Sequence, residues 1–138
     1  KAADEALSLW PGDILFVAAQ VACLRGLGRA EAARTAAADA PEPHRGHEAF
    51  LAYVLAAAGK EQKALTALAG VKAHVPHDAL WAARACAVLD DAQAALDWLE
   101  KGVRLGLRRH ERAAPDPEFA KMAELERFRQ LAGDLRAR

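Results

Sequence analysis

Two His-x-x-His pairs are the side chains whose type and spacing come closest to a metal site. His44 and His47 form one pair, and His74 and His77 repeat it 30 residues later (74 − 44). Imidazole nitrogens bind zinc, copper and nickel, so four of them at one edge of a repeat structure could hold such an ion. Neighbouring edges would stand on the order of 10 Å apart, however, because that is the spacing of packed helices. We interpret the histidines as turn or capping residues and predict no metal site and no cofactor, with metal or ligand sensing as a lesser alternative.

Cysteine and serine offer little material for nucleophilic catalysis. Cys23 and Cys86 are the two cysteines, and they lack the CxxC spacing of a zinc or redox site. Each stands in an apolar helical run, which predicts two buried small hydrophobic side chains. Ser8, the single serine, lies in an N-terminal helical fragment. No histidine or acid accompanies either cysteine at a recognisable spacing, so we predict that the chain is not an enzyme.

Charge and hydropathy argue against two classes of partner. Nineteen Lys and Arg balance nineteen Asp and Glu, which gives no argument for nucleic-acid binding. The basic run RLGLRRHER, residues 104–112, is interpreted as cationic charge at a helix C-terminus, because no aromatic residues interleave it. No apolar stretch approaches the roughly 20 residues that span a bilayer, so we predict no membrane insertion.

The composition and an internal repeat predict an all-α protein. Alanine, leucine, arginine, glutamate and lysine dominate, and asparagine is absent. Three segments recur at 31-residue intervals (59 − 28 and 90 − 59): GRAEAA from residue 28, GKEQKAL from residue 59 and DDAQAAL from residue 90. Each stands between two helical runs, and prolines punctuate the ends of the units. The pattern predicts tandem antiparallel helical hairpins with Gly28, Gly59 and Asp90 in their turns.

These hairpins resemble the tetratricopeptide repeat. That pattern asks for a bulky residue, Leu-Gly and an aromatic residue, followed by alanine, a larger residue and proline. The units match it with Leu51-Ala52, Leu55, Ala64 and Pro76 in the middle, Ala82-Ala83, Cys86, Ala95 and Leu99 in the third, and Val21, Leu24 and Ala33 in the first. The small residues Ala52, Ala64, Ala83 and Ala95 should let paired helices approach, with Leu51, Leu55, Leu96 and Leu99 filling gaps between units.

The resemblance implies a right-handed α-solenoid, expected as one domain over residues 1–138. Its parts would be a partial repeat at 1–11, repeats at 12–42, 43–75 and 76–106, and capping helices at 107–138. The cap is expected from an apolar stripe, and the polar Arg127, Arg129 and Asp134 are expected to face water. The stripe comprises Phe119, Met122, Leu125, Phe128, Leu131 and Leu135. The DPEF and ERF segments resemble the ending of many bacterial members of the family, and further repeats or another domain are expected before Lys1.

In tetratricopeptide proteins the first helix of each hairpin lines a concave groove that holds a peptide. The repeat register places Leu15, Ala18, Ala22 and Arg25, then Ala49, Phe50, Tyr53 and Ala56, then Leu80, Trp81, Arg84 and Ala87 in that groove. The resemblance thus implies non-catalytic binding of a protein or peptide partner in an apolar, aromatic groove, with arginines for acidic groups or a chain end. The alternative is a structural spacer or self-association domain whose groove is filled by the chain itself or by a second copy in a homodimer.

Overall fold

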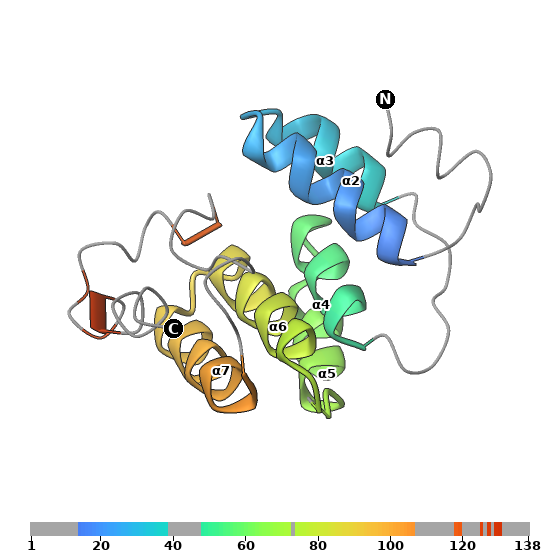
Figure 1. The fold of residues 1–138 in the computed structure, drawn as a ribbon. Helices are drawn as coiled ribbons and strands as arrows, with labels where there is room; N and C mark the ends of the chain where they lie inside the picture. Colours follow the sequence, from blue (N-terminus) through green and yellow to red (C-terminus); the bar gives the residue numbers. More distant parts are fainter. Residues whose placement is uncertain are drawn as a thin grey trace. The chain divides into compact units, whose positions relative to one another are not determined.

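The computed structural model describes residues 14–38, 48–72, 74–106, 118–119, 125, 127 and 129–130. Six α-helices make up most of these residues. The helices are α2 (Ile14–Gly26), α3 (Ala30–Ala38), α4 (Glu48–Ala57), α5 (Glu61–Ala69), α6 (Pro76–Val88) and α7 (Ala92–Leu105) (Figure 1). These described residues include no β-strand. The all-α class expected from composition is therefore confirmed.

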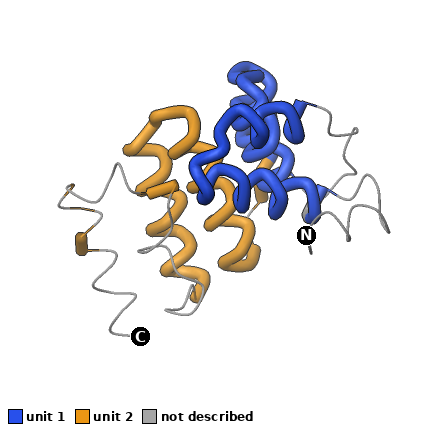
Figure 2. The backbone as a smooth tube through the Cα atoms, turned by 90° about the horizontal axis from the view of Figure 1, so that it is seen from above, with its two compact units in different colours: residues 1–70 blue, residues 71–138 orange. Residues whose placement is uncertain are grey.

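The chain divides into two compact units, residues 1–70 and 71–138 (Figure 2). In the first unit α2 pairs with α3 and α4 pairs with α5, and α4 also packs against both α2 and α3. In the second unit α6 pairs with α7. Each unit thus contains helical hairpins of the kind that the repeat predicts, two in the first and one in the second.

The three hairpin turns share one backbone geometry. Gly28, Gly59 and Asp90 have φ angles of 77°, 81° and 61°, in the left-handed region that glycine adopts freely and that aspartate tolerates better than most residues. The paired hydrogen bonds of a Schellman motif close each turn. They join the N–H groups of Gly28 and Arg29 to the carbonyls of Arg25 and Leu24, those of Gly59 and Lys60 to Ala56 and Leu55, and those of Asp90 and Asp91 to Ala87 and Cys86. The predicted turn residues are confirmed, and the 31-residue repeat is present in the backbone.

The second helix of each hairpin also begins in the same way. The N–H groups of Ala33, Ala64 and Ala95 donate to the carbonyls of Arg29, Lys60 and Asp91, respectively. All three alanines are wholly buried, as the close approach of paired helices requires. At α7 the Asp91 side chain caps the helix by accepting a 3.1 Å hydrogen bond from the Ala94 N–H.

The core is made largely of alanine, with a few larger side chains that fill it. Ala52 and Ala83 are wholly buried, and no polar or charged residue among those described is buried. The largest fully buried side chains are Tyr53, Phe119, Leu80, Leu96, Leu99, Val21 and Val54. Burial of one such side chain stabilises a fold by about 1.5–3 kcal/mol, so these few residues carry much of the apolar stabilisation. Leu51 and Leu55 are only half-buried.

Parts of the expected architecture lie outside the described residues. They include the partial repeat 1–11 and, from the cap, Met122, Phe128, Leu131 and Leu135. Two stripe residues are described, and of these Phe119 is 1% exposed and Leu125 is 36% exposed. Pro76 opens α6 at a position where its missing N–H costs no helical hydrogen bond. Across the described ranges, every helix is too short or too polar to cross a membrane.

Candidate binding site

The first helices of the three hairpins, α2, α4 and α6, carry the residues that the sequence placed in a groove. The structure buries Ala18, Ala49, Tyr53 and Leu80, and leaves Arg25, Phe50, Trp81 and Arg84 half-buried. The Leu15 side chain is not among those described. Of these residues, the half-buried group offers side-chain surface for a partner.

Tyr53 is the largest fully buried side chain in the described chain, with 0% of its surface exposed. Its neighbour along α4, Val54, is also buried, so this part of the helix belongs to the core of the first unit. No buried side-chain nitrogen or oxygen of the described residues lacks a hydrogen-bond partner, the Tyr53 hydroxyl included. Tyr53 therefore belongs to the core of the first unit and offers no surface to a partner.

Trp81 and Arg84 are two expected site residues that are in direct contact. The Arg84 guanidinium carbon lies 4.4 Å from the centroid of the Trp81 ring, within the range of a cation–π interaction. The residues are three apart on α6, which brings their side chains to the same face of the helix. Stacking orients the guanidinium and holds the indole, so the pair presents an apolar surface beside a positive charge.

A second aromatic–cation pair lies on α7, which the sequence analysis did not identify. The Lys101 Nζ lies 5.5 Å from the centroid of the Trp98 ring, and both residues are half-buried. The pair has the same i, i+3 spacing as Trp81 and Arg84, and that spacing is the signal by which the sequence could have revealed it. The α6–α7 hairpin therefore carries one such pair on each of its helices.

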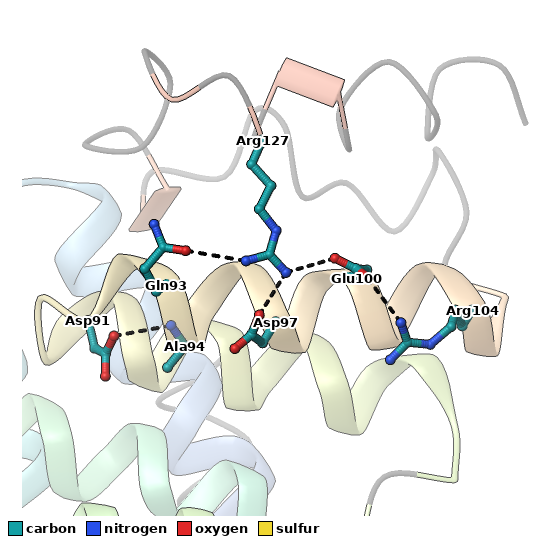
Figure 3. A network of polar contacts seen from close by, with 7 residues as sticks. All are labelled: Asp91, Gln93, Ala94, Asp97, Glu100, Arg104 and Arg127. Atoms are coloured by element: carbon teal, nitrogen blue, oxygen red, sulfur yellow. Dashed lines mark hydrogen bonds and ion pairs between the residues drawn. The ribbon is translucent and has the colours of Figure 1, made fainter.

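Arg127 was expected to face water; it is 36% exposed at the surface, but its guanidinium also binds α7, a contact that the sequence did not predict. Its Nη2 lies 2.7 Å from the Asp97 Oδ1 and 2.7 Å from the Glu100 Oε2, and its Nη1 donates to the Gln93 Oε1 at 3.3 Å. Figure 3 shows the guanidinium reaching from the C-terminal segment to the outer polar face of α7. Two carboxylates on neighbouring turns of one helix face attract a cation, which explains why the arginine is held there.

These contacts shift two pKa values in the directions that the charges require. The hydrogen bond from Arg127, and then its positive charge, lower the pKa of Glu100 below its ordinary value. The pKa of Arg127 is raised, chiefly by the hydrogen bonds to Glu100 and Asp97. Arg104 adds a 3.1 Å ion pair to Glu100 from the last turn of α7, as expected for basic residues at a helix C-terminus. The remainder of the basic run, residues 107–112, lies outside the described residues.

The two cysteines differ, so the expectation that both are buried is wrong for one of them. Cys86 is buried, whereas Cys23 is exposed on α2. Desolvation raises the pKa of the Cys86 thiol to about 12, and the negative charges of Asp91 and Asp97 add to this effect. The Cys86 thiol is therefore kept neutral and out of reach of reagents in solution.

The described residues contain no group of three or more His, Cys, Asp or Glu side chains placed to hold a metal ion. His74 and His77 are exposed, and His44 and His47 lie outside the described residues. No family model, curated protein sequence or solved structure matches this chain. On α6 and α7 the described surface offers contact through paired aromatic and charged side chains.

Proposed function

We propose that this chain is a non-catalytic protein–protein interaction module that binds a peptide segment of its partner along the first helices of its hairpins. Three turns with the same hydrogen bonds, 31 residues apart, support a tandem-hairpin architecture similar to the tetratricopeptide repeat. In the proposed right-handed solenoid, stacked first helices form the wall of a concave groove.

The Trp81–Arg84 pair is the observation that carries this proposal. Tryptophan and arginine are enriched at the energetic hot spots of protein interfaces, where a large apolar surface stands beside a group that binds carboxylates. Here the two are stacked at 4.4 Å on a first helix, and both are half-buried. A side chain already ordered by stacking loses less conformational entropy when a partner binds.

Phe50 occupies the position of α4 that corresponds to Trp81 in the 31-residue repeat (81 − 50), and it is half-buried as well. Of the residues that register assigns to the groove, Phe50, Trp81, Arg84 and Arg25 have side-chain surface with which to contact the partner, whereas Ala18, Ala49, Tyr53 and Leu80 are buried. Leu15 belongs to the same proposed set by register. The partner peptide would combine apolar side chains with an acidic group or a free carboxylate.

The test of this site uses a peptide that is selected from a random displayed library for binding to the full chain. We expect Trp81→Ala and Arg84→Ala to weaken binding of the selected peptide about tenfold or more, measured by fluorescence anisotropy. Trp98→Ala and Lys101→Ala are matched controls, because they remove the equivalent aromatic–cation pair from α7.

The controls should change the affinity by less than about twofold, and circular dichroism should show the same helicity for all four variants. Equal losses in the α6 and α7 variants would contradict the site. Failure to select any peptide would contradict the proposed function itself.

A further inference from the structure

Helix α2 has an apolar face that the first unit leaves open. Phe16 and Gln20 are half-buried, Cys23 is exposed, and Leu27 is 72% exposed, more than any other large hydrophobic side chain described. Leu27 continues the helical turn, since its N–H donates to the Cys23 carbonyl at 3.0 Å. Steps of four, three and four residues place these four side chains on one side of a helix. We call them the open face of α2.

The repeat shows that the same face is covered on α4. Cys23 and Leu27 correspond to Val54 and Ala58, 31 residues later (54 − 23 and 58 − 27), which are only 1% and 8% exposed. Within the unit, α2 packs against its own partner α3 and against α4, which follows it. Helix α4 packs against its own partner α5 and against α2 and α3, which precede it. Within the unit, the cover that α4 has and α2 lacks is therefore a preceding pair of helices.

The open face is separate from the proposed peptide groove. At 3.6 residues per turn, it lies on the opposite side of α2 from Ala18, Ala22 and Arg25, which register assigns to the groove. A molecule on the open face therefore occupies a different surface from a peptide in the groove, and its binding is a property beyond the proposed function.

The open face carries no charge. No residue from Ile14 to Leu24 is charged, and Gln20 is the one polar side chain among the four. Charged groups across an interface select one partner over others, and this face offers none for a foreign partner to match. For the same reason, two copies of the face can meet without placing like charges together. Such self-complementarity is what an interface between two identical patches requires.

The order of side chains along the face is also self-complementary. When two copies of α2 lie antiparallel with Cys23 of one copy opposite Gln20 of the other, Phe16 falls opposite Leu27, because both steps are four residues (20 − 16 and 27 − 23). The bulky side chains then meet at the two ends of the contact. The small thiol lies near its centre, where it lets the helix axes approach to about 8–10 Å.

We propose that the open face of α2 is a self-association surface, on which a second copy of this chain docks its own α2 antiparallel about a two-fold axis. Each helix is about 20 Å long, so the contact is smaller than the roughly 800 Å² per partner of a standard stable complex. The dimer is therefore weak, with a dissociation constant on the order of 10 μM or above. The local concentration of the chain then determines whether it forms.

Sedimentation velocity of the full chain between about 1 and 500 μM tests the surface, and the wild type should pass from monomer to dimer across this range. Leu27→Lys places a charge in the apolar contact and should raise the dissociation constant about tenfold or more. Leu65→Lys, at a 43% exposed leucine of α5, is the matched control and should dimerise as the wild type does. Trp81→Ala should also dimerise normally, because it alters the groove. Circular dichroism should show the same helicity for all variants.

A chain that stays monomeric at every concentration would overturn the proposal and leave the open face to helices of a different protein. Equal weakening by Leu27→Lys and Leu65→Lys, or loss of the dimer in Trp81→Ala, would place the contact elsewhere and would also overturn it.

Cross-linking through Cys23 tests the antiparallel arrangement independently. The two Cys23 residues would be offset by three residues, about 4.5 Å along the helix axes, so a short bismaleimide should join them. Cys86→Ala should cross-link as the wild type does, and Cys23→Ser should not, because Cys86 is buried. Cys23→Ser/Leu27→Cys should cross-link far less than the wild type, since its new thiols would be offset by eleven residues, about 16 Å. Equal cross-linking at positions 23 and 27 would overturn the antiparallel contact.

Discussion

Arg34 of α3 lies over Gly59, the turn residue of the α4–α5 hairpin: a Cβ added at Gly59 would stand 3.0 Å from the Arg34 Nη2. The first hairpin of this unit therefore contacts the turn of the second through a side chain. Gly59 meets two requirements at once, a φ of +81° and room for a guanidinium group. Gly28, the corresponding residue of the first hairpin, has a φ of +77° and nothing within 4 Å of an added Cβ.

Gly28→Ala and Gly59→Ala should therefore both destabilise the protein, by about 1 kcal/mol or more, because left-handed backbone is unfavourable for alanine. We expect the Gly59 variant to lose a few tenths of a kcal/mol more, since the exposed end of Arg34 must move aside but can do so easily. Urea denaturation followed by circular dichroism measures both changes. The excess at Gly59 should vanish in an Arg34→Ala background. No loss in Gly28→Ala would mean that the positive φ is not what selects glycine.

The neighbouring residues Asp90 and Asp91 should respond in opposite directions. Asp90 has a φ of +61°, so Asp90→Gly relieves an unfavourable backbone conformation and should raise the free energy of unfolding by up to about 1 kcal/mol. Asp91 caps α7 through the Ala94 N–H, so Asp91→Ala should lower it by about 1 kcal/mol. Thermal and urea unfolding would measure both, and changes of the same sign would contradict this assignment of turn and cap.

The turns could be predicted from the sequence because their signals are local. Gly28, Gly59 and Asp90 each stand between two helical runs. The backbone at these points has a positive φ, which restricts the residue type chiefly to glycine and a few others such as aspartate. The all-α class follows in the same way from residues that individually favour helix.

The contacts of Arg127 and the exposure of Cys23 are not local properties, and the sequence did not predict them. Arg127 binds Asp97, which lies 30 residues earlier in the chain (127 − 97). The sequence around a polar residue does not indicate which distant residue it will bind. Helix α2 is apolar around much of its circumference, so its pattern does not show which side faces solvent. Repeat register placed Tyr53 in the groove, but its side chain is wholly buried. Register predicts which face of a helix a residue lies on, and it does not predict how deeply the side chain is buried.

The two thiols should differ in reactivity. Cys23 is exposed, whereas burial raises the pKa of Cys86 to about 12, and the thiolate is the reactive form. In native protein at mildly alkaline pH, we expect a disulfide reagent to modify one thiol quickly and the second only on the timescale of unfolding. Cys23→Ser should abolish the fast phase, and Cys86→Ala should leave it intact. A fast phase that persists in Cys23→Ser would show that Cys86 is accessible.

Tyr53→Ala should lower the stability of the folded protein. Truncating a wholly buried aromatic side chain leaves a cavity, and we expect the free energy of unfolding to fall by about 3–5 kcal/mol. Phe50→Ala, three residues earlier on α4 and half-buried, should cost clearly less in the same urea titration. Equal costs would mean that Phe50 is as much a part of the core as Tyr53, and would remove it from the proposed binding surface.

The carboxylates that hold Arg127 make this contact sensitive to acid. Because the pKa of Glu100 is lowered in the folded protein, its contribution to stability is fully present above the ordinary carboxyl pKa and is lost as pH falls through the lowered value. Arg127 stays charged throughout this range, so protonation of Glu100 alone breaks their ion pair. Carbon-13 NMR of the Glu100 carboxyl should give a titration midpoint that rises toward the ordinary value in Arg127→Ala. Arg104→Ala should raise it less, because Arg104 is a smaller cause of the shift than Arg127. A larger rise in Arg104→Ala would mean that the pair within α7, and not the contact with the C-terminal segment, controls the charge of Glu100.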